Sequence, residues 1–353
     1  MYVKDSSGTI LKAHCPNPGK LTEFLIPGQP LLIERHESAE RRTDCTAVAV
    51  LYRGKVIYLY SAQANHIARN LVIPELHPGK TIIGEQQVGS SRFDFLLPGD
   101  RPILIEVKSC SLVEHRLGMF PDTATARGSR HVTELGELAL TGYQPEVLFI
   151  ISHEDAEAFM PNPHTDPLFC TTLHRVKPQV QLHAASAAAS PEGFVRIVNR
   201  DIPIETELPA RLAEANCGFY LLILQVTKPV KIPVSRIDSP QLNPGWYIYA
   251  GSAKQHLEQR VQRHLRKRKV RHWHIDHLTQ EAEVLKVFPV RTFADLECSV
   301  SKDIASISDG SIPGFGCSDC SCGSHLHYFY DNPLHNRAVV DVIFAYRHLH
   351  FQR

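Results

Sequence analysis

Asp94, Glu106 and Lys108 lie within a short stretch that is rich in β-forming residues, at positions 92–109. Two apolar-rich runs flank the turn-forming sequence P-G-D-R-P, and this pattern predicts a β-hairpin with a five-residue loop. With the loop centred on residues 99–101, cross-strand partners have numbers that sum to 200, so Asp94 faces Glu106. Opposed like charges destabilise a hairpin. The pair indicates a divalent cation between the carboxylates, with Lys108 able to steady developing negative charge. The alternative is a hairpin whose charged face is simply solvated.

Basic residues gather in two places that could contact a phosphate backbone. Residues 260–271 include seven lysines or arginines and no acid, and Trp273 follows. A basic helix beside an aromatic residue suits nucleic acid, and a merely solvated helix usually mixes both signs. The predicted helix 123–140 carries four polar side chains at spacings of three or four, on a face that is either phosphate-binding or solvated: Arg127, Arg130, His131 and Glu134. The candidate nucleic-acid-binding residues are Arg127, Arg130, Arg263, Arg266, Lys267, Arg268, Lys269 and Arg271.

Soft metal ligands are concentrated near the C-terminus. Five cysteines and histidines fall within eleven residues: Cys317, Cys320, Cys322, His325 and His327. Zinc takes four such ligands in a tetrahedron. We expect a Zn²⁺ site built from the first four of these residues, with Cys298 as a further thiol that could come close in space. The alternative is a glycine-rich loop of free thiols and core histidines.

Composition bounds the rest of the interpretation. A chain of 353 residues with 43% apolar residues suits two or three domains with real cores. Its 38 basic and 37 acidic residues nearly balance, so total charge says little about partners. Neither a membrane span nor an apolar leader is predicted. The odd count of nine cysteines fits free or metal-bound thiols in the cytoplasm better than disulfides.

Three domains follow from the distribution of elements. Residues 1–80 read as short strands between Gly and Pro turns, residues 81–207 mix strands with a helix, and residues 208–353 open on strongly apolar strands. Strands are expected at 31–35, 46–52, 56–60, 81–88, 147–151, 194–204, 217–226 and 246–251. Helices are expected at 123–140, 255–269 and 292–304, a low-complexity loop at 184–190, and a Pro-rich segment at 228–244. In the hairpin, alternation assigns one apolar face to Phe93, Phe95, Leu97, Ile103, Ile105 and Val107.

The first half of the chain resembles the sugar fermentation stimulation protein A family. The matching segments are Ala13–Leu21, Ser91–Leu96, Glu106–His115, Phe120–Leu135 and Tyr143–Ile151. The resemblance implies an OB-like β-barrel at 1–80 and a PD-(D/E)xK nuclease-like α/β domain at 81–207. It also implies that Asp94 and Glu106 hold Mg²⁺ or Mn²⁺ and that Lys108 takes part in catalysis.

The second half resembles GIY-YIG nucleases. Gly218–Tyr220 and Tyr249–Gly251 look like the two signature tripeptides, and Arg260 and His264 lie four residues apart on one predicted helix. Glu297 completes the order of the pattern. The resemblance implies that the catalytic residues are Tyr220, Tyr249, Arg260, His264 and Glu297: tyrosines that help to activate water, an arginine that stabilises charge, and a glutamate that holds metal. The chain departs from the pattern in the long separation of the two tyrosines and in lacking a match for the asparagine that often follows the glutamate. Without this resemblance, two aromatic strands of this kind belong to a core more often than to a catalytic site.

Three functions remain open from the sequence. The first is a metal-dependent nuclease that acts on nucleic acid, with DNA as the expected partner. The second is a non-catalytic DNA-binding regulator of sugar metabolism genes, built on nuclease folds. The third is a barrel protein with a structural metal and no nucleic-acid partner. Paired carboxylates favour the first, because they repel phosphate unless a cation is present.

Overall fold

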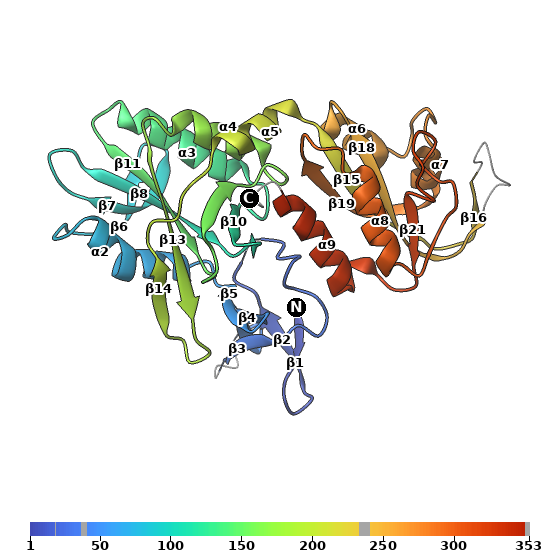
Figure 1. The fold of residues 1–353 in the computed structure, drawn as a ribbon. Coiled ribbons are helices and arrows are strands. Elements are labelled where there is room, and N and C mark those ends of the chain that lie inside the picture. The colour runs from blue at the N-terminus through green and yellow to red at the C-terminus, as the bar shows by residue number, and fades with distance from the viewer. Residues whose placement is uncertain (18, 37–40, 233–240, 350–353) are drawn as a thin grey trace. The chain divides into compact units, whose positions relative to one another are not determined.

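The structure is a computed structural model that describes residues 1–17, 19–36, 41–232 and 241–349. The chain forms two compact units, Met1–Ala210 and Arg211–Arg353, which run from blue to yellow-green and from yellow to red in Figure 1. Across the described ranges, no helix has both the length and the apolar character needed to cross a membrane. The fold is the predicted multidomain mixture of α/β and α+β structure.

One mixed sheet runs through the first unit. In the described part it has eleven strands, and nine of them follow one path, with β3 added at β4 and β14 added at β13. The path is β1 (Tyr2–Lys4), β2 (Ile10–His14), β4 (Cys45–Tyr52), β5 (Lys55–Tyr58), β13 (Gln181–Ala189), β11 (Gln144–Ile151), β8 (Ile103–Cys110), β7 (Ser91–Leu97) and β6 (Ile83–Val88). The two added strands are β3 (Leu31–Arg35) and β14 (Val195–Asn199). The sheet therefore continues from the N-terminal strands into the strands of the hairpin.

Strand β13 corrects the prediction of a loop at residues 184–190. It pairs in parallel with β11, from Glu146↔Gln181 to Ile151↔Ser186, and Ala184, Ala185 and Ala187 are buried. Alanine and serine are not strand-favouring residues, so the stretch carries no local strand signal. Here the neighbouring strands impose the conformation.

The predicted hairpin is formed by β7 and β8, and its register is confirmed by the pairs Phe95↔Ile105, Leu96↔Leu104 and Leu97↔Ile103. The predicted division of its faces is wrong in part. Phe93 packs with Leu104 in the cluster that faces helix α3 (Ala126–Ala139), whereas Phe95 packs in the cluster around helix α1 (Gln63–Ile67). Helices thus cover both sides of the hairpin, where Glu106 is buried, whereas Arg92 stays exposed.

The helices of the first unit form layers on the two sides of this sheet. Helix α1 continues through η1 (Ala68–Val72) into α2 (Ile73–Leu76) on one side. Helix α3 and α4 (Pro167–Val176) pack together and against β11 on the other (Figure 1). The N-caps are Thr125 and Asp166, whose side chains accept the backbone N–H of Gly128 and Phe169. A small sheet of β9 (Val113–Glu114), β10 (Leu117–Phe120) and β12 (Ala158–Pro161) completes the unit.

The second unit is built on a five-stranded sheet in the order β19-β15-β18-β21-β20. Its strands are β19 (Glu283–Arg291), β15 (Gly218–Val226), β18 (Gly245–Ala253), β21 (Leu326–Phe329) and β20 (Gly310–Ser311). The short strands β16 (Val230–Lys231) and β17 (Gln241–Leu242) pair with each other. Residues 233–240, half of the predicted Pro-rich segment, lie outside the described residues.

Alternation along β15 divides the core of the second unit in two. Tyr220, Leu222 and Leu224 point into the cluster formed with helices α6 (Leu257–Leu265) and α7 (His274–Glu281). The intervening residues Phe219, Leu221 and Ile223 pack with α8 (Glu297–Ile307) and α9 (Arg337–His348). The remaining helices are α5 (Glu207–Ala215) and the single turn η2 (Pro333–His335). The result is a sheet between two helical layers, which explains the unbroken apolar character of β15.

Helix α6 ends at Leu265, four residues before the predicted end. The cause is Lys269, whose side chain is only 4% exposed. Its Nζ donates to the carbonyl oxygens of Arg263 and His264, at 3.3 and 2.8 Å. These carbonyls belong to the last turn of the helix, so the ammonium group caps it. The basic run after Leu265 is consequently a folded-back segment and not a continuous basic helix.

Candidate functional site

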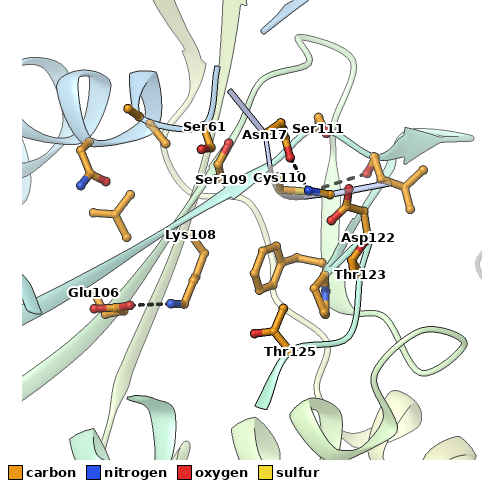
Figure 2. A pocket seen from close by; sticks show the side chains of 18 of the residues that line it. Asn17, Ser61, Glu106, Lys108, Ser109, Cys110, Ser111, Asp122, Thr123 and Thr125 are labelled. Atoms are coloured by element: carbon orange, nitrogen blue, oxygen red, sulfur yellow. Dashed lines mark hydrogen bonds and ion pairs between the residues drawn. The ribbon is translucent and has the colours of Figure 1, made fainter. Parts of the chain in front are cut away.

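The hairpin carboxylates line a cavity of about 380 Å³ in the first unit, which we call the first cavity. Asp94 lies on β7, and Glu106 and Lys108 lie on β8. Figure 2 shows Glu106 and Lys108 meeting at the wall of this cavity. Asn65 on α1 and Arg127 on α3 also line it. The structure thus brings together the three residues singled out in the hairpin.

Glu106 is buried, and its two oxygens differ in environment. Oε1 accepts hydrogen bonds from Lys108 Nζ at 2.5 Å and from His131 Nδ1 at 2.7 Å. Oε2 is buried and accepts no hydrogen bond from any residue that the structure describes. Burial raises the pKa of Glu106, but the bonds from His131 and Lys108 outweigh it, so the pKa is lowered overall. The carboxylate is therefore held ionised with one oxygen unsatisfied.

Asp94 reaches the cavity from the end of the β7–β8 pairing. Its Oδ2 accepts the backbone N–H of Val107 at 2.8 Å, and its Oδ1 accepts Asn65 Nδ2 at 2.7 Å. The side chain thereby takes the place of a strand partner for Val107. Burial, followed by the negative charge of Glu106, raises the pKa of Asp94. Two buried carboxylates that repel each other form a favourable binding site for a cation, because the cation neutralises their charge.

The residues present fit a hard divalent cation. Carboxylate oxygens are the ligands that Mg²⁺ and Mn²⁺ prefer. Glu106 Oε2 is a buried acceptor without a donor, which costs free energy unless something positive meets it. A third carboxylate, Asp122, lines the same cavity, and its Oδ2 is likewise buried and without a hydrogen-bond donor among the described residues. Figure 2 shows Asp122 beside Cys110, away from Glu106.

His131 is a site residue that sequence reasoning placed wrongly. It was expected on a phosphate-binding or solvated face of its helix, but it is 3% exposed and holds Glu106. Its other ring nitrogen, Nε2, accepts Arg127 Nε at 3.3 Å, which gives a relay from Arg127 through His131 to Glu106. Arg130 remains exposed and lies 3.9 Å from Glu134. Helical spacing does not show which side of α3 faces the sheet. Only the fold reveals that His131 is buried and Arg130 is exposed.

A second cavity, of about 210 Å³, is lined by all five residues of the GIY-YIG resemblance: Tyr220, Tyr249, Arg260, His264 and Glu297. Strands β15 and β18 supply the tyrosines, α6 supplies Arg260 and His264, and the start of α8 supplies Glu297. Arg260 donates to the carbonyl oxygen of Ser252 at 3.0 Å and lies over the ring of Trp273, 4.6 Å from its centroid. The separation of the tyrosines in sequence is bridged by the pairing of β15 with β18.

Tyr220 and His264 form a buried hydrogen bond of 2.7 Å between the hydroxyl and Nε2. Burial lowers the pKa of His264 to about 4 and raises that of Tyr220. His264 Nδ1 lies 3.6 Å from a carboxylate oxygen of Asp276. A proton on Nδ1 faces this negative charge, so neutral His264 accepts the phenol proton at Nε2. Asp276, fully buried, was not foreseen as part of the site.

The basic segment is largely committed to internal contacts. Arg263 makes two hydrogen bonds to Asp276, at 2.7 and 2.9 Å, and Lys267 Nζ donates to the carbonyl oxygens of Thr279 and Ala282. Arg271 donates to Gln280 at 2.7 Å, and Lys269 caps α6. Arg266 and Arg268 are exposed. The charge run therefore stabilises the loop between α6 and α7, with Arg266 and Arg268 directed to its surface.

The cysteine prediction needs one substitution. Ligand atoms of Cys298, Cys320, Cys322 and His325 all lie within 4.8 Å of one another. Cys317 is not among them. His327 is also excluded from the group, since both its nitrogens bond to the hydroxyls of Ser301 and Ser311.

Comparison with known protein families finds three matches along the chain. Residues 1–59 match the SfsA N-terminal OB domain, residues 60–193 the sugar fermentation stimulation protein RE domain, and residues 219–347 a domain of unknown function, DUF123. A sugar fermentation stimulation protein homolog from Natranaerobius thermophilus is 36% identical over 192 residues, which cover 51% of this chain and 80% of that protein. A sugar fermentation stimulation protein homolog from Moorella thermoacetica is 42% identical to this chain over 173 residues, which cover 47% of this chain and 75% of that protein.

A solved structure supports the same relationship. The structure of Pyrococcus furiosus SfsA in complex with Ca²⁺ matches with a TM-score of 0.50 and 25% identity, over 58% of this chain and 94% of that one. The family matches and this structure confirm the predicted OB and SfsA domains, and the match at residues 219–347 confirms the GIY-YIG-like C-terminal domain. The chain belongs to the sugar fermentation stimulation protein family, with a GIY-YIG-like domain following the two domains of that family.

Proposed function

We propose that this chain binds nucleic acid, with DNA as its partner, and hydrolyses phosphodiester bonds with Mg²⁺ or Mn²⁺ at the first cavity. The observation that carries the proposal is the environment of Glu106: a buried carboxylate beside Asp94, with one oxygen lacking any described hydrogen-bond donor. Such an arrangement is costly without a cation. The Ca²⁺ complex of Pyrococcus furiosus SfsA supports a divalent cation in a related protein.

The residues around the two carboxylates have roles that their contacts support. Asp94 and Glu106 would hold the cation, which supplies charge neutralisation at the scissile phosphate and a more acidic bound water. Lys108, 12% exposed, lines the cavity and can donate to a phosphate oxygen when Glu106 engages the cation. His131 keeps Glu106 oriented and ionised through its 2.7 Å bond. Asn65 and the Val107 backbone fix the carboxylate of Asp94.

The second cavity supports the same class of reaction independently. Tyr220 is paired with a neutral histidine that can accept its proton, and Arg260 lies near enough to share the cavity with Glu297. We assign Tyr220 and Tyr249 to water activation, Arg260 to charge stabilisation and Glu297 to metal binding, with His264 as the partner of Tyr220. Arg127 at the first cavity, together with the exposed Arg130, Arg266 and Arg268, would meet the nucleic-acid backbone.

The domain limits 1–80, 81–207 and 208–353 and a cytoplasmic location belong to the same proposal. All nine cysteines are free thiols, which suits a reducing compartment.

A second candidate function is that of a non-catalytic DNA-binding regulator of sugar metabolism genes. The salt bridge between Lys108 and Glu106 favours it, because this pairing already neutralises one carboxylate of the candidate site.

Cleavage assays on the full chain separate the two functions. Wild-type protein, Glu106→Gln, Glu297→Gln and the double variant would be incubated with single- and double-stranded DNA and RNA, with Mg²⁺, Mn²⁺ or chelator. An enzyme that uses the first cavity loses cleavage by orders of magnitude in Glu106→Gln, and Glu137→Gln, which changes an exposed glutamate of α3, serves as the control. A wild-type chain that binds DNA and cleaves no substrate with any metal would exclude the nuclease and leave the regulator.

A further inference from the structure

The second unit contains a cluster of three cysteines and one histidine that do not line either cavity. We propose that Cys298, Cys320, Cys322 and His325 bind one Zn²⁺ ion, and that His325 transmits the position of this ion to Glu297 through a hydrogen bond. The site would be structural in its ligand set, with four protein ligands and no open position. It would also be a positioning device for a glutamate that lines the second cavity.

The distances between the ligand atoms fit tetrahedral zinc. Zinc–sulfur bonds of about 2.3 Å and zinc–nitrogen bonds of about 2.0–2.1 Å separate a sulfur from a nitrogen ligand by about 3.6 Å in a tetrahedron. His325 Nε2 lies 3.5 Å from Cys320 Sγ and 3.9 Å from Cys298 Sγ. All four ligand atoms lie within 4.8 Å of one another. An ion can therefore be accommodated with shifts of no more than about 1 Å, since tetrahedral zinc separates two sulfur ligands by about 3.8 Å.

The orientation of His325 independently favours a metal. Its side chain is 2% exposed, and its Nδ1 lies 2.9 Å from Glu297 Oε1. The carboxylate accepts a proton carried on Nδ1, which leaves Nε2 of the neutral ring with a lone pair directed at the sulfurs. Histidine ligands of metals commonly donate their other ring nitrogen to a carboxylate in this way. His325 thus has the direction of a zinc ligand, with Glu297 placed to accept the proton on Nδ1.

The site would join two segments that build the second cavity. Cys298 lies in the first turn of α8, directly after Glu297, whereas Cys320 and Cys322 lie in the loop between β20 and β21. The same loop contributes Gly316, Ser318 and Asp319 to the cavity wall. A zinc ion shared by α8 and the loop would fix this wall relative to Glu297. The inference concerns zinc binding, so it stands whether or not the second cavity cleaves nucleic acid.

Zinc content of the full chain tests the ligand set. Protein purified without chelator is expected to carry one zinc per chain, and Cys298→Ser, Cys320→Ser and Cys322→Ser should each lose most of it. Cys317→Ser is the matched control, since this thiol comes from the same loop and lies outside the group. Zinc in the wild type together with loss in Cys317→Ser and retention in Cys298→Ser would overturn the proposed set, as would a wild-type chain that takes up no zinc.

Alkylation of the wild-type protein tests the same ligand set without any substitution, so it does not depend on whether a variant folds. With zinc bound, Cys298, Cys320 and Cys322 should be protected from a thiol reagent while Cys317 reacts, and a chelator should expose all three together. Mass spectrometry of the labelled peptides measures this. Independent labelling of the three thiols, unaffected by chelator, would contradict a shared ion.

The link to Glu297 has its own test. Removing the carboxylate charge in Glu297→Gln should weaken zinc binding about 10–100-fold in a chelator competition, the usual effect of losing such an outer partner. Zinc stoichiometry at saturation should stay at one, because the four ligands remain. An unchanged affinity would disprove the coupling of Glu297 to the ion, and cleavage activity plays no part in either measurement.

Discussion

The hydroxyl of Tyr220 and Nε2 of His264 lie 2.7 Å apart inside the second unit, and both side chains are almost fully buried. In this hydrogen bond, a neutral His264 can accept the phenol proton at Nε2, whereas a charged His264 would have to donate a proton from Nε2. Burial, which lowers the pKa of His264 to about 4, keeps it neutral at physiological pH. The pair therefore has a measurable signature in the pH dependence of stability.

The second unit should lose stability as the pH falls from about 6.5 towards 4. Its unfolded form binds a proton at His264 near the ordinary pKa of 6.5, whereas the folded form does so only near 4. The unfolded state thus gains protons first, with a cost on the order of 2–3 kcal/mol per histidine at the acid end. Burial also lowers the pKa of His327 to about 4, so the two histidines act in the same window.

Urea unfolding followed by tryptophan fluorescence checks this, because both tryptophans, Trp246 and Trp273, belong to the second unit. His264→Gln should remove part of the loss between pH 6.5 and 4, and His327→Gln another part. If the double variant keeps the full wild-type pH dependence, these histidines are not its source.

Asp94→Asn should stabilise the first unit in the absence of divalent cations. Burial and the Glu106 charge raise the pKa of Asp94, so the folded protein is destabilised while the group is ionised, and acidification relieves it. We expect the unfolding midpoint to rise by roughly 2–4 °C, as for about 1 kcal/mol in a domain of this size. The gain should fade at acid pH, where Asp94 of the wild type is protonated.

Thermal unfolding by circular dichroism, with and without Mg²⁺ or Mn²⁺, measures both effects of Asp94→Asn. The cations should raise the wild-type midpoint by binding the folded state and leave the variant nearly unchanged. A variant less stable than the wild type without metal, and equally stabilised by metal, would argue against the two-carboxylate site.

His131→Ala should weaken divalent-cation binding about 10–100-fold, because Glu106 loses the donor that orients it. Stability should also fall, by about 3–5 kcal/mol, since a buried pair is broken. Isothermal titration with Mn²⁺ measures the first effect and urea unfolding the second. Arg130→Ala, one position earlier and 61% exposed, should change neither. Equal effects of the two substitutions would mean that α3 as a whole, and not the bond to Glu106, is responsible.

The basic segment should divide into two classes of residue. Arg266→Ala and Arg268→Ala should leave stability unchanged and each reduce the slope of DNA affinity against salt by about 0.9, if each contacts one phosphate. Lys269→Ala should instead destabilise the second unit by about 1–3 kcal/mol, because buried acceptors lose their donor. Fluorescence anisotropy at several salt concentrations and urea unfolding distinguish them. An unchanged slope in both arginine variants would leave the segment with a structural role alone.

Patterns that repeat along the chain predicted much of this structure. Alternation and the turn sequence gave the hairpin register that pairs Phe95 with Ile105, and apolar runs gave β15 and β18. The strand β13 was missed because its alanines and serines have no strand preference. These residues form a strand only because they pair with β11. The end of α6 was missed because a lysine that caps a helix from beyond its end looks like a continuation of it.

The same distinction between local and long-range signals applies to the residues of the candidate sites. Residues within one motif, such as Asp94, Glu106 and Lys108, could be found from spacing. Partners from distant segments were harder to identify: His131, which reaches Glu106 across 25 positions, was placed on the wrong face, and Cys298, which reaches His325 across 27, was named only as a thiol that could come close. No local periodicity records such contacts, which the packing of helices on the sheet creates.

The joining of β5 to β13 has a consequence for synthesis of the chain on the ribosome. Val56 pairs with Ala189, so the edge that β5 presents is covered by a strand made 133 positions later. At about 5–20 residues per second, the early strands wait roughly 7–27 s for their neighbour. During that interval an unpaired strand edge is open to other nascent chains. The first unit should thus depend on chaperones more while it is being translated than after its release.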